Sequence, residues 1–340
     1  MAEIKRVYEQ IKEHIVKEAA KKQPGEYLRS EVQYSRLFKV SRPTVRKAVE
    51  ELLREEVVDR IPGKGIVVHE RKQKKGTLLL SIPYVPDDGF FYNMINGCID
   101  ASNRSGYDYV IANHTSTRER YEYIKTLDIK RFQAAVITVH SEQDLEILKY
   151  FSKASLPFIL VDNPVDGADC PYVITDDFSG GYMMAEYLIR KGHIGILYLT
   201  LDRKINTVMR REAGFRKALE DNGVMIREER IVKLARDEDV KEIIRGSVKG
   251  CSAVFAYSDL PVIMAYNELV EKGMRVPDDI SLAGYGDFAY SSMLPVPLTT
   301  VRMPVYDMGY KAVEIICDKE MDRKLVLDVE LVERQTVSFK

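Results

Sequence analysis

The chain has 340 residues, which exceeds the usual size of one domain and favours two or more. Hydrophobic residues make up 45% and charged residues 30% of the sequence, a balance that excludes disordered, collagen-like and membrane-embedded proteins. The net charge of −1 conceals a division, because residues 1–76 hold 19 Lys and Arg against 12 Asp and Glu, whereas residues 77–340 hold 32 against 40. The amino-terminal part therefore suits a polyanion such as nucleic acid.

The sequence predicts no metal, no cofactor and no membrane partner. The four cysteines lie far apart without a Cys-x-x-Cys pair, so we expect reduced thiols rather than metal ligands. There is no run of about 18 apolar residues, and no apolar leader follows the first methionine. A cytoplasmic location is therefore expected.

The first 38 residues are predicted to form two helices. Apolar residues at helical spacing predict a helix over residues 3–20, and Pro24 and Gly25 end it. Ser30 is expected to cap a shorter helix that continues to residue 38. The core face of this second helix is expected to consist of Tyr34, Leu37 and Phe38.

A third helix and a hairpin complete a predicted winged helix-turn-helix, which we assign to residues 1–69. Ser41 is expected to be the N-cap of the third helix, and Pro43 lies in its first turn, where a missing N–H costs nothing. The outer face of this helix carries basic and hydroxyl side chains, which suit guanine edges and phosphates in a major groove. Strands at 57–61 and 66–69, joined by the turn at 62–65, predict a wing.

The residues expected to contact DNA are helix caps, the exposed face of the third helix and the tip of the wing. A basic helix face alone has solvation as an alternative explanation, and a Gly-Lys-Gly turn alone is a weak signal. The two together, with the turn 17 residues after Arg46, favour DNA binding. The candidates are Ser30, Ser41, Arg42, Thr44, Arg46, Lys47, Gly63, Lys64 and Gly65.

The segments LRSE (28–31), VSRPTVRKA (40–48) and PGKG (62–65) resemble the winged helix-turn-helix of the GntR family of bacterial regulators. The resemblance implies DNA contacts by Ser41, Arg42, Thr44 and Arg46 and by residues 63–65 of the wing. In that family a basic residue usually follows the Ser-Glu pair and often contacts the operator, whereas this chain has Val32. The resemblance therefore does not extend to that base contact. Residues 70–76 are hydrophilic and mainly basic, and we interpret them as a linker.

From residue 77 onward, short apolar runs alternate with amphipathic helices, which predicts parallel sheets with helices on both faces. Strands are expected at 78–82, 109–112, 134–139, 158–161, 194–200, 253–257 and 280–284. Helices are expected near 91–105, 119–128, 142–152, 178–191, 207–222, 238–248, 260–273 and 304–318. These units exceed one doubly wound sheet. We therefore predict an α/β domain of two Rossmann-like lobes, with a ligand cleft at the carboxyl ends of the strands.

No enzyme motif is found in this part of the chain, which lacks G-x-G-x-x-G, Walker and G-x-S-x-G patterns and has dispersed histidines. Strand ends instead carry carboxylates, an arginine and aromatic residues, a set suited to a polyhydroxylated ligand. Each candidate also has an ordinary explanation as a core, cap or surface residue. The expected effector contacts are Tyr84, Phe90, Phe91, Asp162, Arg211, Ser258, Asp259 and Asp287.

The segments FF (90–91), FILVDN (158–163), RREAGF (210–215), VPDDIS (276–281) and PLTTV (297–301) resemble the LacI/GalR effector domain, which is related to periplasmic sugar-binding proteins. The resemblance implies a sugar held by Asp162, Arg211 and Ser258, with ring stacking at residues 90–91. Two positions depart from the family, because Ser258 replaces an Asn and Gly286 replaces an Asp. A ligand with fewer hydroxyls or in another orientation is therefore expected.

A GntR-type head on a LacI-type body is similar to the arabinose-responsive regulators of Gram-positive bacteria, which implies L-arabinose as the effector. The combined prediction is a homodimeric repressor that the sugar releases from double-stranded operator DNA. The sequence is compatible with a sugar that releases the regulator from DNA and with one that recruits it to DNA. Helices near 91–128 and around 285–300 are both candidate dimer faces. A DNA-tethered sugar enzyme and a solute-binding protein of a transporter are the alternatives; neither a catalytic cluster nor a leader supports them.

Overall fold

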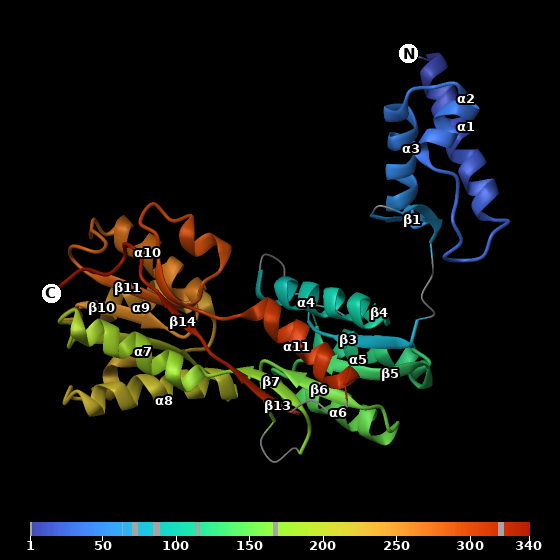
Figure 1. The fold of residues 1–340 in the computed structure, drawn as a ribbon. Helices are drawn as coiled ribbons and strands as arrows, with labels where there is room; N and C mark the ends of the chain where they lie inside the picture. The colour runs from blue at the N-terminus through green and yellow to red at the C-terminus, as the bar shows by residue number, and fades with distance from the viewer. Residues whose placement is uncertain are drawn as a thin grey trace. The chain divides into compact units, whose positions relative to one another are not determined.

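The computed structural model describes residues 2–62, 64–69, 74–83, 89–112, 114, 116–165, 169–318 and 323–340. The chain divides into two compact units, Met1–Lys74 and Lys75–Lys340. Figure 1 shows the helices and strands of each unit, which we describe separately.

The first unit is a winged helix-turn-helix. Its helices are α1 (Ala2–Ala19), α2 (Glu31–Phe38) and α3 (Arg42–Arg54), and its wing is the antiparallel pair β1 (Val58–Ile61) and β2 (Gly65–Val68). The predicted three helices and hairpin are therefore confirmed. Its core takes one apolar stripe from each helix and the inner side of the wing, including Ile11, Ile15, Tyr34, Val45, Ala48, Val49, Leu52, Val58 and Ile66.

One core assignment in this unit was wrong. Leu37 is 51% exposed, whereas Tyr34 is fully buried and Phe38 is partly buried. The ring of His14 on α1 makes edge contacts with Tyr34 and Phe38, at centroid distances of 6.4 and 5.2 Å. Because α1 covers only this side of the short α2, Leu37 lies outside the contact.

The first lobe of the second unit is a six-stranded parallel sheet in the order β13-β7-β6-β5-β3-β4. Its strands are β3 (Thr77–Ser81), β4 (Asp108–Ile111), β5 (Phe132–Ile137), β6 (Phe158–Val161), β7 (Tyr172–Thr175) and β13 (Lys324–Leu327). Its helices are α4 (Gly89–Ser105), α5 (Thr117–Thr126), α6 (Glu142–Lys153) and α11 (Val305–Cys317).

The second lobe is a six-stranded sheet in the order β14-β12-β11-β10-β8-β9, in which only β14 runs antiparallel to its neighbour. Its strands are β8 (Ile196–Leu201), β9 (Ile231–Leu234), β10 (Ala253–Ala256), β11 (Ser281–Gly286), β12 (Thr299–Arg302) and β14 (Glu330–Val332). Its helices are α7 (Asp177–Arg190), α8 (Asn206–Asp221), α9 (Val240–Ser247) and α10 (Asp259–Glu271).

The chain passes between the lobes three times, from β7 to α7, from β12 to α11 and from β13 to β14. The carboxyl-terminal α11, orange-red in Figure 1, consequently packs beside the teal α4 of the first lobe. Their backbones touch, because a Cβ on Gly97 would lie 2.0 Å from the Tyr306 carbonyl oxygen and one on Gly309 would lie 2.0 Å from the Met94 carbonyl oxygen. A glycine also allows close backbone contact between α7 and α8, because a Cβ on Gly181 would lie 2.1 Å from the Arg211 carbonyl oxygen.

The predicted two-lobed α/β architecture is confirmed, and every predicted strand and helix of this unit is present with ends shifted by a few residues. Five strands were missed: β7, β9, β12, β13 and β14. Each has only three or four residues, and β13 and β14 lie at sheet edges with partly exposed side chains. The edge strands therefore lack the buried apolar run that identifies a central parallel strand, whereas β7 and β12 are short buried runs that contain threonine.

Candidate functional site

The outer face of α3 is the candidate DNA-binding face. Val45, Ala48, Val49 and Leu52 bury the inner face in the core. With 3.6 residues per turn, the side chains between them lie on the opposite face. That face presents exposed Arg42, Arg46 and Lys47 and partly exposed Thr44.

Ser30 and Ser41 are the N-caps of α2 and α3, as predicted, but their hydroxyls make different hydrogen bonds. Ser30 forms a capping box with Gln33: its Oγ accepts from the Gln33 N–H at 3.3 Å, and its own N–H donates to Gln33 Oε1 at 2.8 Å. Ser41 makes no side-chain cap, and its Oγ lies 2.9 Å from Thr44 Oγ1. The Ser30 hydroxyl therefore already serves the α2 terminus, whereas Ser41 and Thr44 form an exposed hydroxyl pair.

Glu31 on α2 forms ion pairs with two arginines at this face. The Glu31 carboxylate accepts from Arg46 Nε at 3.5 Å and from Arg60 Nη2 at 2.5 Å, so one side chain of α2 joins α3 to β1. Arg60 and the role of Glu31 were not predicted. Glu31 was recognised only as part of the family motif, and the pairing of β1 beside α3 could not be deduced from spacing.

The wing continues the basic surface at its tip. Lys64 is exposed, and Gly65 has a φ of 124° with open space around its Cβ position, a conformation that favours glycine. Gly63 lies outside the described residues. On α3, Lys47 Nζ lies 5.8 Å from the centre of the Tyr8 ring, so this cation also contacts α1.

The candidate ligand site is a cavity of about 470 Å³ between the carboxyl ends of the strands of the two lobes. This volume is in the range of small-molecule sites. The first lobe contributes the end of β3, the start of α4 and the turns after β4 and β5. The second lobe contributes the turns after β8, β9 and β10. The lining residues are Pro83, Phe91, Thr117, His140, Ser141, Asp144, Leu201, Arg203, Asp237 and Tyr257.

Of the seven predicted effector contacts that lie within the described residues, only Phe91 lines this cavity. Phe90 and Asp287 line a second cavity of about 300 Å³. Asp162 and Arg211 are almost buried, at 4% and 6% exposure, and Ser258 is the half-buried N-cap of α10. Tyr84 lies outside the described residues. The predicted residues thus surround the cleft but do not form one lining.

Arg211 is held by contacts within the protein. Its Nε donates to Asp177 Oδ1 at 2.7 Å, and its Nη1 donates to the Tyr257 carbonyl oxygen at 2.8 Å. Its guanidinium carbon lies 3.9 Å from the centre of the Tyr285 ring. The glycine contact between α7 and α8 fixes the backbone from which Arg211 extends. Arg211 therefore links α8 to the start of α7 and to the turn after β10, behind the wall of the cleft.

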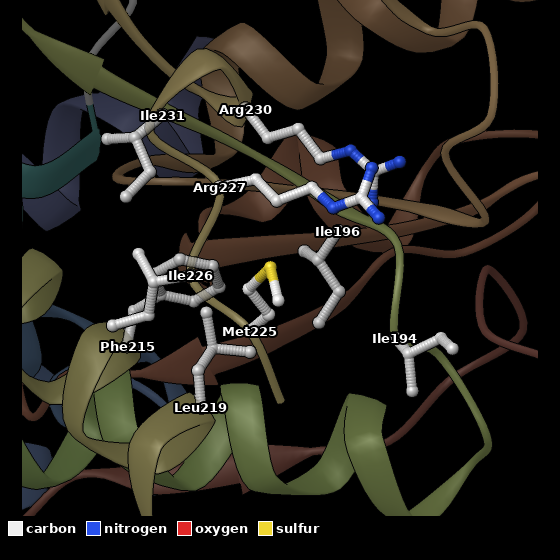
Figure 2. Close-up of a pocket in the computed structure, with 9 residues that line it drawn as sticks. All are labelled: Ile194, Ile196, Phe215, Leu219, Met225, Ile226, Arg227, Arg230 and Ile231. Carbon is white, nitrogen blue, oxygen red and sulfur yellow. The ribbon is translucent and has the colours of Figure 1, made fainter. Parts of the chain in front are cut away.

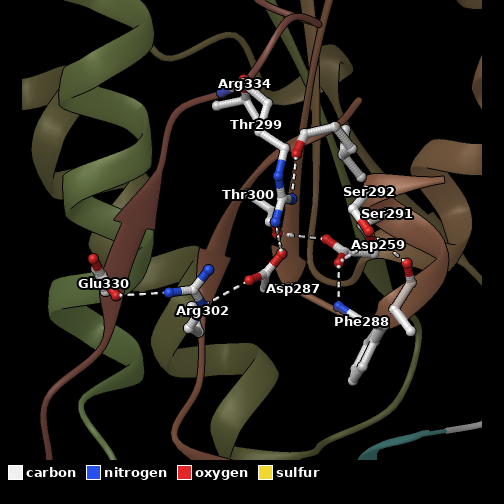
Figure 3. A network of polar contacts seen from close by, with 12 residues as sticks. Asp259, Asp287, Phe288, Ser291, Ser292, Thr299, Thr300, Arg302, Glu330 and Arg334 are labelled. Atoms are coloured by element: carbon white, nitrogen blue, oxygen red, sulfur yellow. Dashed lines mark hydrogen bonds and ion pairs between the residues drawn. The ribbon is translucent and has the colours of Figure 1, made fainter. Parts of the chain in front are cut away.

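Asp259, the first residue of α10, is bonded to β12 and to the segment after β11 and does not line the cleft cavity (Figure 3). It is fully buried; its Oδ2 accepts from Ser291 Oγ at 2.6 Å and from the Phe288 N–H at 3.1 Å, and its Oδ1 accepts from Thr300 Oγ1 at 2.6 Å. Burial raises the pKa of this carboxyl, and the three hydrogen bonds partly oppose that rise. Both oxygens are occupied, so the expected ligand contact at Asp259 is not supported.

Asp287 belongs to the ion-pair chain also drawn in Figure 3. Its carboxylate contacts Arg334 Nη2 at 2.5 Å and Arg302 Nε at 2.7 Å, and Arg302 Nη1 continues to Glu330 at 3.1 Å. The chain ties β11, β12 and β14 together beside two of the interlobe crossings. At the neighbouring Gly286, the Phe288 ring lies 2.5 Å from the Cβ position. The Phe288 ring therefore occupies the space beside position 286, where LacI/GalR proteins usually have an Asp.

Other hollows are less suited to an effector. Figure 2 shows a pocket at the amino ends of β8 and β9, away from the cleft, with a volume of about 10 Å³, enough for about one water. A hollow of about 610 Å³ lies beside α8 and β9 and shares Leu201 and Arg203 with the cleft cavity. The cavity that Phe90 and Asp287 line also takes residues from both lobes, but at about 300 Å³ it is smaller than the cleft cavity. The cleft cavity has walls at the ends of β3, β5, β8 and β10, where open α/β sheets bind ligands.

Within the described residues, no three His, Cys, Asp or Glu side chains are arranged to hold a metal ion. The cysteines at positions 98, 170, 251 and 317 are free thiols. Over the same residues, none of the helices has the length and apolar character needed to cross a membrane.

Comparison with known proteins matches both units. The model of the bacterial regulatory proteins of the gntR family matches residues 3–68, and that of the periplasmic binding protein-like domain matches residues 185–337. The arabinose metabolism transcriptional repressor of Geobacillus stearothermophilus is 26% identical over 310 residues, covering 86% of this chain and 85% of the relative. The regulator RegA of Clostridium saccharobutylicum is 28% identical over 304 residues, covering 85% and 91%.

A solved structure, the transcriptional regulator CelR in complex with cellobiose, superimposes with a TM-score of 0.70 at 22% identity, covering 87% of this chain and 90% of the other. This similarity shows a shared fold. The two domain matches and the names of the relatives agree with the resemblances found in the sequence. The chain is therefore a transcriptional regulator, not an enzyme, that joins a GntR-type winged helix-turn-helix to a LacI-type, periplasmic-binding-protein-like domain.

Proposed function

We propose that this regulator is a homodimeric repressor whose affinity for operator DNA is lowered by a sugar. Residues 1–69 bind the operator, residues 70–76 link the two parts, and residues 77–340 bind the effector and dimerise. A dimer presents two winged heads to a pseudo-palindromic site, because two-fold protein symmetry matches two-fold DNA symmetry.

The exposed face of α3 supports the DNA-binding role. Arg42, Arg46 and Lys47 project from the side opposite the core, and Ser41 and Thr44 add hydroxyls at the start of the helix. Helix residues of this kind read base edges while hydroxyls and the helix terminus take phosphates. Residues 63–65 at the wing tip add a backbone-accessible turn and a lysine for phosphate contact. Ser30 acts in this scheme as a cap of α2.

The single observation that carries the effector role is the cavity of about 470 Å³ whose wall is shared by both lobes. A ligand that touches both lobes prefers one separation of the lobes over others. It can therefore shift a conformational equilibrium by its differential affinity, typically by 1 to 3 kcal/mol. Phe91 contacts the ligand directly in this proposal, and Asp162, Arg211 and Ser258 position the wall behind it.

L-arabinose is the first candidate effector, because a relative that aligns along most of the chain is named a repressor of arabinose metabolism. The related fold with bound cellobiose supports a carbohydrate more generally.

The test begins with operators selected from a random duplex pool by the full-length protein. Gel-shift titrations with L-arabinose, other pentoses and hexoses then measure operator affinity, and thermal melting of the protein measures sugar binding. We expect L-arabinose to raise the melting temperature and to weaken operator binding by about 5- to 150-fold. A sugar that binds but strengthens operator binding would reverse the proposed direction of control. Absence of any sugar effect on either readout would contradict the proposal.

A further inference from the structure

His140 in the cleft was not predicted as a ligand contact, and its backbone is held unusually firmly. It follows β5, and its N–H and that of Ser141 donate to Asp144 Oδ2 at 2.9 and 3.0 Å. The other oxygen of Asp144 pairs with buried Arg120. Arg120 also donates to the carbonyl oxygens of residues 81 and 138, at the ends of β3 and β5. The turn that carries His140 is therefore anchored to two strands.

The imidazole ring is oriented from two sides. The Phe91 ring meets it edge to face, with centroids 5.5 Å apart and an interplanar angle of 83°. Its Nε2 is buried and makes no hydrogen bond to any described residue, and Asp162 Oδ2 lies 3.5 Å from it. A carboxylate beside Nε2 favours the tautomer with the proton on that atom, which leaves Nδ1 as an acceptor. The side chain is 27% exposed and lines the cavity.

The charges around the cavity leave no surplus cation for an anionic ligand. Burial, opposed by Asp144 and aided by Arg120 and Arg211, lowers the pKa of His140 to about 4, so the ring is neutral at pH 7. Arg120 pairs with Asp144, and Arg211 pairs with Asp177 behind the wall.

The remaining charged lining residues are one of each sign. Asp237 accepts from the Tyr257 hydroxyl at 2.7 Å, and Arg203 is exposed at the rim. A phosphate or carboxylate ligand would meet at least one carboxylate for each cation. A buried ion without a partner is costly, whereas a hydroxyl needs only a hydrogen bond.

We propose that the effector is an uncharged, hydroxyl-bearing molecule, and that His140 sets its specificity by accepting a hydrogen bond from one hydroxyl. Phe91 and Tyr257 in the same wall cover an apolar face of the ligand. Asp162 acts through the imidazole as a positioning residue. The inference rests on the proposed function, which it deepens by naming the ligand chemistry and a residue that reads it.

The experiment uses the full-length protein, thermal melting and isothermal titration calorimetry at pH 7.5. The probes are L-arabinose, D-ribose, D-xylose and D-glucose, together with arabinose 5-phosphate, ribose 5-phosphate and glucose 6-phosphate. We expect one or more neutral sugars to bind at least tenfold more tightly than any phosphate. His140→Ala should weaken the best neutral sugar tenfold or more and reduce the differences among sugars. His140→Gln, which retains an acceptor, should recover part of the loss.

His114→Ala is the matched control. His114 also lies in the first lobe, has a buried Nδ1 and packs on an aromatic ring, with its centroid 4.8 Å from that of Tyr123, but it is not among the cavity-lining residues. Its sugar affinity should equal that of the wild type. Circular dichroism and the melting temperature without ligand establish that each variant is folded.

The outcomes separate the inference from the proposed function. If a phosphorylated sugar binds more tightly than every neutral sugar, or if folded His140→Ala and His140→Gln both bind like the wild type, the inference is overturned while the regulator stands. If no sugar in either form binds, the proposed function fails and the inference fails with it.

Discussion

The two recognition surfaces of this regulator use charge in opposite ways. On α3 and the wing, Arg42 and Lys64 are exposed and make no ion pair with any described residue, and Arg46 and Arg60, which pair with Glu31, are exposed as well. In the cleft, Arg120 and Arg211 are buried, and each is paired with a carboxylate. Exposed cations suit a polyanion, because they release counterions on binding DNA and lose little solvation. Buried pairs instead fix geometry, and a charged ligand could use one partner only by leaving the other unpaired.

The largest effect should come from breaking a buried pair in the cleft. Arg211→Met leaves Asp177, which is 1% exposed, without its cation, and should lower the free energy of unfolding by about 3 to 5 kcal/mol. Urea denaturation followed by circular dichroism measures the change. The control is Arg210→Met, because Arg210 is 45% exposed and lies 3.9 Å from Asp176. That neighbour should change stability by at most about 0.5 kcal/mol. Similar losses for both variants would contradict the bracing role of Arg211.

The matching test on the DNA side is Arg46→Ala. If Arg46 reads a guanine, its loss should weaken operator binding by about 1 to 3 kcal/mol and relax sequence preference at one base position. Gel-shift titration against the selected operator and its single-base variants provides the measurement. Arg54→Ala, at the exposed last turn of the same helix, is the control and should retain affinity. Unchanged affinity in Arg46→Ala would remove the residue from the DNA-binding face.

Sequence reasoning succeeded where a pattern is local. Helix periodicity and N-cap chemistry located α2 and α3, and the alternation of apolar runs and helices gave the two lobes. It failed where the outcome depends on which strand ends face one another. Asp259 and Asp287 follow their strands as expected. Their oxygens, however, are occupied by hydroxyls and arginines from the turn after β11, from β12 and from the carboxyl-terminal segment.

His140 shows the opposite failure. It follows β5 at the correct edge of the sheet, but a lone histidine carries no motif. Its significance depends on Phe91 and Asp162, which come from other elements, and on Asp144, whose pairing with Arg120 spans 24 residues. Contacts of this kind are set by tertiary packing, so no pattern within a short window could have shown them.

The neutral state of His140 should appear as a pH dependence of stability. As the pH falls below the unfolded value of 6.5, the unfolded ring binds a proton while the folded ring, with a pKa of about 4, does not. Stability present at pH 7.5 is therefore lost progressively, by about 2 kcal/mol at pH 5. His140→Gln removes this contribution. The measurement is the difference between wild type and variant in unfolding free energy at the two pH values. An equal pH dependence in both would show that the ring is not held neutral.

The smallest effect concerns the wing and separates the two surfaces by salt. Lys64→Ala should reduce the slope of log affinity against log salt concentration for operator binding by about 1, with similar weakening on every DNA sequence. Sugar binding to the cleft, measured by calorimetry over the same salt range, should change little, because Arg120 and Arg211 are paired and the proposed ligand is uncharged. A sugar affinity that falls with salt as steeply as operator affinity would mean that both surfaces bind anions.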